Sequence, residues 1–315
     1  MLILDDSSGG HSARLDMLEQ RMIDMKVERW SGADLLQDHD RVVVEEALEI
    51  CLVYGAVDQR TRKTVTVTMR TPGNDLELAV GFLFAEGLVR CPEDVQSLQH
   101  CGLPAGPLGL QNVVRVELRP EATIDPALLE RNFMSTSSCG LCGKASLDAL
   151  PALPRTGLSD GLVVEAAVIQ DLSSRLRHAQ AVFDATGGLH AAALFDRRGE
   201  LHDVKEDVGR HNAIDKLVGR QFLDGSVPLS DRMLLVSGRV GYELVQKAFA
   251  AGIPFLAAVG APSSLAVDLA RAANLTLVGF VKERRFNIYA ASQRISHNAG
   301  VCEPSYPRGS HEHSR

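Results

Sequence analysis

The feature that most constrains the fold is a regular alternation of strand and helix patterns in the second half of the chain. Apolar runs and strict alternation predict strands, and apolar residues at helical spacing predict helices between them. The predicted strands cover residues 190–195, 201–204, 233–237, 255–259, 275–281 and 286–289, and the predicted helices cover 163–180, 209–218, 242–251 and 263–273. This alternation is typical of a mixed α/β sheet with helices on both faces. We assign residues 131–290 to this domain.

The preceding residues predict a small α+β domain over residues 41–130. Strand patterns cover residues 42–57, 63–70 and 112–118, and a mostly apolar helix is predicted over 76–89. The stretch from 92 to 109 is rich in Gly and Pro and is typical of a loop.

Both ends of the chain have weaker patterns. Leu15, Leu18, Met22 and Met25 have helical spacing, which indicates at most a loose amphipathic helix in a mostly flexible extension over residues 1–40. Residues 291–315 are dominated by Pro, Gly, Ser and His, and we expect a disordered tail.

Composition restricts the class of protein. With a net charge of −7, the chain lacks the basic footprint of a general nucleic-acid binder. We expect no membrane insertion and no signal peptide, because no apolar run approaches membrane-spanning length and the N-terminus lacks a charged start followed by an apolar core. Six cysteines in 315 residues are no disulfide framework, which favours a reduced, cytoplasmic setting.

A pair of cysteines in the segment Ser138-Cys-Gly-Leu-Cys-Gly143 predicts thiol chemistry. Hydroxyl side chains upstream and apolar helical spacing downstream place Cys139 and Cys142 near a helix N-terminus, which favours the thiolate. Lys144 adds a positive charge with the same effect. Metal binding, dithiol–disulfide exchange and carriage of sulfur as a persulfide are all compatible with this spacing.

Four loops at the ends of predicted strands are richer in polar residues than a connection requires. They are His202-Asp-Val-Lys-Glu-Asp-Val-Gly-Arg-His-Asn212 (continuing to Asp215 and Lys216), Ser237-Gly-Arg-Val-Gly-Tyr-Glu243, Val259-Gly-Ala-Pro-Ser-Ser-Leu265 and Phe280-Val-Lys-Glu-Arg-Arg-Phe-Asn-Ile-Tyr289. Ligands of α/β sheets bind beyond the strand ends, so these loops are the expected site. Helix capping, surface ion pairs and a solvated basic turn are the purely structural interpretations.

Within these loops, basic side chains indicate a large anionic ligand such as a nucleotide or a pterin. Arg239 is suited to bidentate contact with a phosphate, and Arg210 and His211 begin a predicted helix. The basic segment beside aromatic residues adds further candidates, namely Phe280, Val281, Lys282, Glu283, Arg284 and Arg285. We expect no metal site, and we interpret Cys91, His100 and Cys101 as structural.

Together these motifs resemble the FdhD family of formate dehydrogenase accessory sulfurtransferases, over about residues 45–289. The further segments that resemble it are Thr71-Pro-Gly-Asn-Asp75, Gly81-Phe-Leu-Phe-Ala-Glu-Gly87, Ala261-Pro-Ser-Ser-Leu265 and Phe286-Asn-Ile-Tyr289. The family usually has Arg and Gly where this chain has Lys282 and Glu283, and Ser where Gly241 and Gly260 stand.

The resemblance implies a cytidine-deaminase-like fold with an added N-terminal unit, and a homodimer. It implies a sulfur carrier that receives sulfur from a cysteine desulfurase and passes it to the molybdenum bis(molybdopterin guanine dinucleotide) cofactor of formate dehydrogenase. Cys139 would hold the persulfide and Cys142 would assist. The segment from Phe280 to Arg285 would contact the cofactor, and a guanine nucleotide would occupy the same pocket.

Three other functions are compatible with parts of the sequence. A zinc deaminase requires a His-x-Glu before a Pro-Cys-x-x-Cys, but no His-x-Glu precedes Cys139 and Ser138 replaces the proline. A thiol–disulfide oxidoreductase would use the cysteine pair but leaves the basic loops unexplained. A chaperone that only binds the cofactor would use the loops without carrying sulfur.

Overall fold

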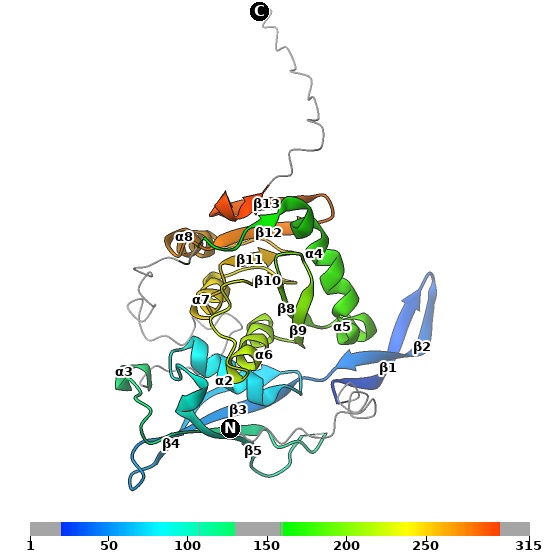
Figure 1. Cartoon of the computed structure of the whole chain (residues 1–315). Coiled ribbons are helices and arrows are strands. Elements are labelled where there is room, and N and C mark those ends of the chain that lie inside the picture. Colours follow the sequence, from blue (N-terminus) through cyan, green and yellow to red (C-terminus); the bar gives the residue numbers. More distant parts are fainter. Residues whose placement is uncertain (1–19, 107, 130–157, 159, 297–315) are drawn as a thin grey trace, which may run out of the picture.

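The computed structural model describes residues 20–106, 108–129, 158 and 160–296. Among these residues, the largest sheet has six strands in the order β13-β12-β11-β10-β8-β9 (Figure 1). Its strands are β8 (His190–Phe195), β9 (Leu201–Asp207), β10 (Met233–Val236), β11 (Phe255–Ala258), β12 (Thr276–Lys282) and β13 (Arg285–Ala290). Strands β10, β11 and β12 are parallel, whereas β8 is antiparallel to both of its neighbours.

Helices cover both faces of this sheet, as the sequence predicted. The helices are α4 (Ala166–Ala179), α5 (Ala181–Thr186), α6 (Arg210–Leu223), α7 (Tyr242–Ala250) and α8 (Ser264–Ala272). Leu234 and Val236 of β10 belong to the core shared with α6, α7 and α8, while Met233 and Leu235 belong to the core shared with α4. The continuous apolar runs predicted as strands therefore bury both faces. The closer likeness to cytidine deaminases stays a prediction.

A second sheet, with the order β4-β3-β6-β5 among the described residues, forms the smaller α+β unit. It contains β3 (Glu46–Tyr54), β4 (Thr61–Arg70), β5 (Val95–Cys101) and β6 (Val113–Leu118), accompanied by α2 (Asp75–Ala85), η1 (Pro92–Asp94) and α3 (Pro126–Leu129). Strand β5 lies in the stretch predicted as a loop, so that prediction is wrong for residues 95–101. The boundary near residue 130 lies outside the described residues and stays a prediction.

The two units meet where α2 crosses α6. A Cβ atom at Gly81 would lie 1.9 Å from the carbonyl oxygen of Asp215, and one at Gly219 would lie 1.9 Å from that of Glu77. Only glycine fits at this crossing, because the two helix backbones are in contact. Phe222 of α6 extends into the core of the smaller unit and packs against Phe84, with ring centroids 5.1 Å apart.

The predictions for the two ends of the chain need correction. Residues from Met22 onward form no helix but an antiparallel hairpin of β1 (Met22–Ser31) and β2 (Asp34–Val43). After residue 290, the chain forms η3 (Ser292–Arg294) and β14 (Ile295–Ser296), which pairs with β7 (Val164–Glu165) ahead of α4. Buried Arg294 forms a 2.9 Å ion pair with Asp160, so the expected disordered tail does not begin at residue 291.

Candidate functional site

The predicted thiol loop lies outside the described residues. The described chain stops at Leu129, after α3, and resumes at Leu158, whose backbone N–H donates to the carbonyl of Ala273 next to α8. The roles of Cys139 and Cys142 therefore remain predictions.

The loops predicted to bind a ligand meet at one edge of the six-stranded sheet. Strands β9, β10, β11 and β12 all end at this edge, because β8 is antiparallel to both β9 and β10. The N–H of Gly260 donates to the carbonyl of Gly238 at 3.1 Å, and the N–H of Phe280 donates to the carbonyl of Gly260 at 3.1 Å. These hydrogen bonds hold three of the four loops side by side at the strand ends, where ligands of α/β sheets bind, and the ligand site itself stays a prediction.

Four basic side chains, His190, Arg210, His211 and Arg239, form what we call the basic cluster. A Cβ atom at Gly238 would lie 3.3 Å from Nδ1 of His190 and 3.8 Å from Cδ of Arg210, which shows how closely the two residues flank this loop. Burial lowers the pKa of His190, and the charges of Arg210, His211 and Arg239 lower it further. The sequence patterns do not predict His190 as a site residue. The one sequence property that marks it is a polar residue at the start of an apolar strand.

Arg210 has a donor without an acceptor. Its Nε atom is buried and has no hydrogen-bond partner among the described residues, although the residue as a whole is partly exposed. Neither Arg210 nor Arg239 forms an ion pair with a described residue. An unpaired buried N–H is costly, and an anion bound at the cluster would satisfy it.

His211 is held by a carboxylate on the next helix. Its Nε2 lies 2.9 Å from Oε2 of Glu243, and both side chains are mostly buried. Burial lowers the pKa of His211, although Glu243 acts in the opposite direction. Glu243 therefore orients His211, which adds a polar contact to the cluster.

The basic segment forms a tight turn at the same edge. Lys282 pairs with Arg285 across the turn, where Arg284 has a φ of 68°. The side chains of Lys282, Glu283, Arg284 and Arg285 are exposed, and Phe280, with a φ of 54°, is 40% exposed. Val281 instead lies buried in the core shared with α4. Its role as a contact residue stays a prediction.

The carboxylates of residues 206–212 have structural partners within the fold, as in the alternative interpretation of this segment as capping and ion pairs. Asp207 is fully buried, accepts hydrogen bonds from Gly209 N–H at 2.8 Å and Asn212 Nδ2 at 3.0 Å, and lies 2.7 Å from Lys216 Nζ. Lys216 also donates to the carbonyl of Thr71 at 2.7 Å. Together these contacts lock the Thr71-Pro-Gly-Asn-Asp75 turn onto α6.

The other acidic residues of this region are also partnered. Glu206 accepts from the backbone N–H groups of Val182 and Phe183 and so caps α5. Asp215 lies 2.6 Å from Lys247 Nζ on α7, and burial raises the pKa of Asp215 to about 6 against the effect of that lysine. Only the basic residues of the segment remain for a ligand.

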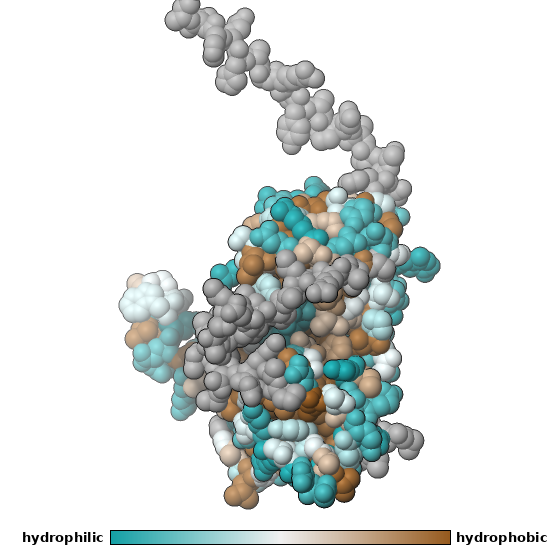
Figure 2. Space-filling model, turned by 90° about the vertical axis from the view of Figure 1, so that its left-hand side faces the viewer, coloured by the Kyte–Doolittle hydropathy of each residue, from teal (hydrophilic) through white to brown (hydrophobic). Residues whose placement is uncertain are grey.

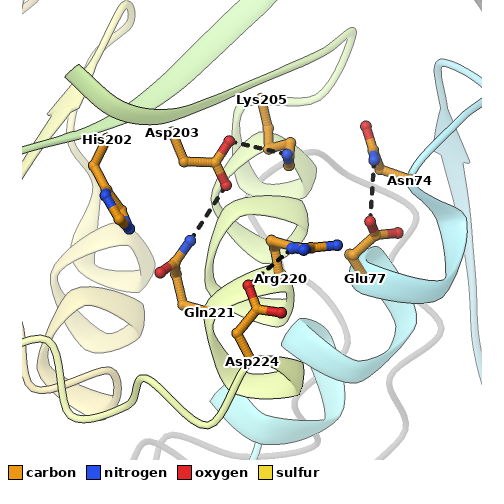
Figure 3. A pocket seen from close by; sticks show the side chains of 8 residues that line it. All are labelled: Asn74, Glu77, His202, Asp203, Lys205, Arg220, Gln221 and Asp224. Atoms are coloured by element: carbon orange, nitrogen blue, oxygen red, sulfur yellow. Dashed lines mark hydrogen bonds and ion pairs between the residues drawn. The ribbon is translucent and has the colours of Figure 1, made fainter. Parts of the chain in front are cut away.

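A separate pocket of about 360 Å³ lies beside the start of β9 (Figure 3). It is lined by Asn74, Glu77, His202, Asp203, Lys205, Arg220, Gln221 and Asp224. Lys205 and Gln221 bind Asp203, Arg220 binds Asp224, and Asn74 binds Glu77, so most of its polar groups bind one another. The basic cluster, at the opposite end of α6, is the better candidate.

Two further properties bear on function. Within the described part of the chain, no group of three or more His, Cys, Asp or Glu side chains is arranged to hold a metal ion. None of the described helices has the length and apolar character needed to cross a bilayer.

Comparison with known proteins places the chain among its relatives. It is 51% identical over 267 residues to the "Sulfur carrier protein FdhD" of Streptomyces avermitilis, covering 84% of this chain and 92% of that protein. It is 46% identical over 276 residues to the protein of the same name from Mycobacterium tuberculosis, covering 86% and 97%.

A solved structure shares the fold. A protein from Desulfotalea psychrophila, for which a role as formate dehydrogenase accessory protein has been suggested, matches with a TM-score of 0.64 and 22% identity, over 87% of this chain and 99% of that one. The model of the FdhD/NarQ family matches residues 44–296, which include the basic cluster and the Thr71-Pro-Gly-Asn-Asp75 turn. The chain belongs to the FdhD/NarQ family.

Proposed function

We propose that this protein is a sulfur carrier that serves formate dehydrogenase in the cytoplasm. It takes sulfur from a cysteine desulfurase as a persulfide on Cys139 and transfers it to the molybdenum bis(molybdopterin guanine dinucleotide) cofactor, which is its bound substrate. The names of relatives at about 50% identity support the carrier role, and the cysteine pair of the sequence supplies the thiols.

The observation that supports cofactor binding best is the basic cluster at the strand ends. The cofactor carries two dinucleotide diphosphates, and the unpaired Arg210 Nε donor together with the Arg239 guanidinium suits such oxygens. Exposed Phe280, at the same edge, offers an aromatic face on which a guanine can stack. Lys282, Arg284 and Arg285 add positive charge beside it.

In the loading step, the Cys139 thiolate attacks the outer sulfur of the desulfurase persulfide. A new S–S bond forms on Cys139 and the desulfurase cysteine leaves as a thiolate, so atoms and charge balance. Cys142 assists as a neighbouring thiol. The contribution of the pocket is positioning, because holding the dinucleotide ends fixes where sulfur is delivered. We also propose that the protein acts as a homodimer.

The test is mass spectrometry of the protein after incubation with a cysteine desulfurase and cysteine. The proposal predicts a reducible gain of one sulfur atom on the Cys139 peptide, absent in Cys139→Ala and retained in Cys91→Ala as the matched control. If no adduct forms and the pair is a stable disulfide, the protein is a thiol–disulfide oxidoreductase. If Cys139→Ala still supports formate dehydrogenase maturation, the protein only binds the cofactor.

A further inference from the structure

Four charged or titratable side chains lie between α6 and α7, next to the basic cluster. The surface in Figure 2 mixes hydrophilic and hydrophobic residues, whereas these four side chains are mostly buried. His211 and Asp215 lie one helical turn apart on α6, and Glu243 and Lys247 lie one turn apart on α7. We call these four residues the ion network.

The ion network consists of two pairs that join the helices. Nε2 of His211 lies 2.9 Å from Oε2 of Glu243, and Nζ of Lys247 lies 2.6 Å from Oδ1 of Asp215. Lys247 is thus bound to Asp215, and among the described residues only His211 pairs with Glu243. The Glu243 side chain is 12% exposed, so water does little to stabilise its charge. That charge is fully balanced only when His211 is protonated.

The interior side of His211 carries more negative than positive charge. Glu86, at the end of α2, acts through its charge on both Asp215 and Lys247. Its Oε2 atom is buried and has no hydrogen-bond partner among the described residues. The carboxylates of Glu86, Asp215 and Glu243 therefore face one ammonium group, that of Lys247. This excess of buried negative charge favours a proton on His211.

The outer side of His211 carries the rest of the basic cluster. Arg210 precedes His211 on α6, His190 begins β8, and Arg239 follows β10. The charges of Arg210, His211 and Arg239 all act on His190, so the members of the cluster repel one another when they are charged. Without a ligand, a proton on His211 would add charge to a cluster whose two arginines form no ion pair with a described residue.

The pKa of His211 reflects both sides. Burial lowers it, Glu243 raises it, and the charges of Lys247 and Arg210 lower it. An anion bound at the cluster offsets the charge of Arg210 and adds negative charge nearby, which raises the pKa of His211. A ligand that raises a pKa binds with uptake of protons, and its affinity increases as the pH falls from the pKa of the bound form to that of the free form.

We propose that His211 is the proton-accepting contact of the anion site, and that Glu243 positions it and stabilises its protonated form. Because a carboxylate only accepts, Nε2 of His211 donates to Glu243, and the proton from solution is taken up on Nδ1. The new Nδ1–H then donates to a phosphate oxygen of the ligand. This inference rests on the proposed function of the cluster, and it makes the site favour ligands with more negative charge.

The test is calorimetric titration of GDP at about pH 7 in Tris and in MOPS, two buffers with different enthalpies of ionisation. The difference in observed binding enthalpy between the buffers gives the number of protons taken up. We expect net uptake by the wild type, with an affinity that rises by up to about tenfold for each unit by which the pH falls. In His211→Gln, and in Glu243→Gln, which keeps the shape but removes the carboxylate, the proton balance should fall to that of the GDP phosphate alone.

His202→Gln, in the separate pocket of Figure 3, is the matched control and should take up protons like the wild type. Proton uptake that is lost in His190→Gln but kept in His211→Gln overturns the inference, and this comparison does not depend on whether Glu243→Gln folds. GDP binding by the wild type with the same proton balance as His211→Gln also overturns it, but leaves the nucleotide site standing. A wild-type protein that binds no GDP overturns both.

Discussion

Two sets of charged side chains in residues 206–212 lie within a few residues of each other yet have opposite environments. Asp207 is fully buried and receives its partners from the chain itself, through Gly209, Asn212 and Lys216. Arg210, only three residues later, has a buried Nε that finds no partner in the described part of the chain. Asp207 and Arg210 lie in the same charge-rich stretch of sequence, so the density of charged residues alone does not identify a binding site. What distinguishes the two residues is whether the folded chain supplies a partner for the charged group.

The largest expected loss of stability comes from removing the ion pair between Asp207 and Lys216. Lys216→Met would leave the Asp207 carboxylate buried and unpaired, which we expect to cost about 3–5 kcal/mol of unfolding free energy. Arg220→Met, which breaks the exposed pair with Asp224, is the matched control and should cost less than about 1 kcal/mol. Urea denaturation followed by circular dichroism measures both, and equal losses in the two variants would show that Asp207 is not specially dependent on Lys216.

The close contact between α2 and α6 can be tested by adding one methyl group at the crossing. Gly81→Ala places a Cβ atom 1.9 Å from the Asp215 carbonyl oxygen, so α2 and α6 must separate, at a cost of about 3 kcal/mol. Gly241→Ala is the control, because no atom lies within 4 Å of its Cβ position and its φ of −93° suits alanine. A Gly81→Ala protein as stable as Gly241→Ala would mean that the helices do not touch there.

Acid should reduce the stability that Asp75 contributes at the Thr71-Pro-Gly-Asn-Asp75 turn. Burial acts to raise the pKa of Asp75, but hydrogen bonds from His100 and Arg70 outweigh it and lower the pKa to about 2. Because this pKa is below that of an unfolded aspartate, the stabilisation is complete above about pH 4 and is lost as pH falls toward 2. We expect the difference in unfolding free energy between wild type and Asp75→Asn to shrink by about 2 kcal/mol over that range.

The control for this pH dependence is Asp231→Asn, whose carboxylate is 72% exposed and whose loss should change little at any pH. If the Asp75→Asn difference stays constant between pH 5 and pH 2, the carboxylate is not held by Arg70 and His100 as the structure shows.

Much of the fold could be predicted because its strands bury apolar residues on both faces or alternate strictly. The sheet core from β8 to β12 follows from such runs, and the site follows from where parallel strands end. The hairpin of β1 and β2 could not be predicted, because its residues are paired across two strands and because Met22 and Met25 also fit helical spacing. Strand β5 was hidden because Gly and Pro surround it.

Side-chain roles at the site were harder to predict. Val281 lies between basic residues in the sequence, but strand alternation turns its side chain into the core. His190 precedes an apolar run and shows no local motif, so its proximity to Arg210 appears only once β8 lies between β9 and β10. Partners of Asp207 come from residues up to 136 positions away in sequence, such as Thr71, and no local pattern reveals them.

Arg210→Ala should change stability least of these variants. Calorimetric titration of GDP into this variant is the most direct test of the contrast between paired and unpaired charges. We expect an unfolding free energy within about 0.5 kcal/mol of wild type and a GDP affinity at least about tenfold weaker, because a charge-assisted hydrogen bond is lost. Arg220→Ala, which changes the separate pocket of Figure 3, should bind GDP like wild type. Unchanged GDP affinity in Arg210→Ala, with weakened affinity in Arg220→Ala, would contradict the assignment of the strand-end cluster as the nucleotide site.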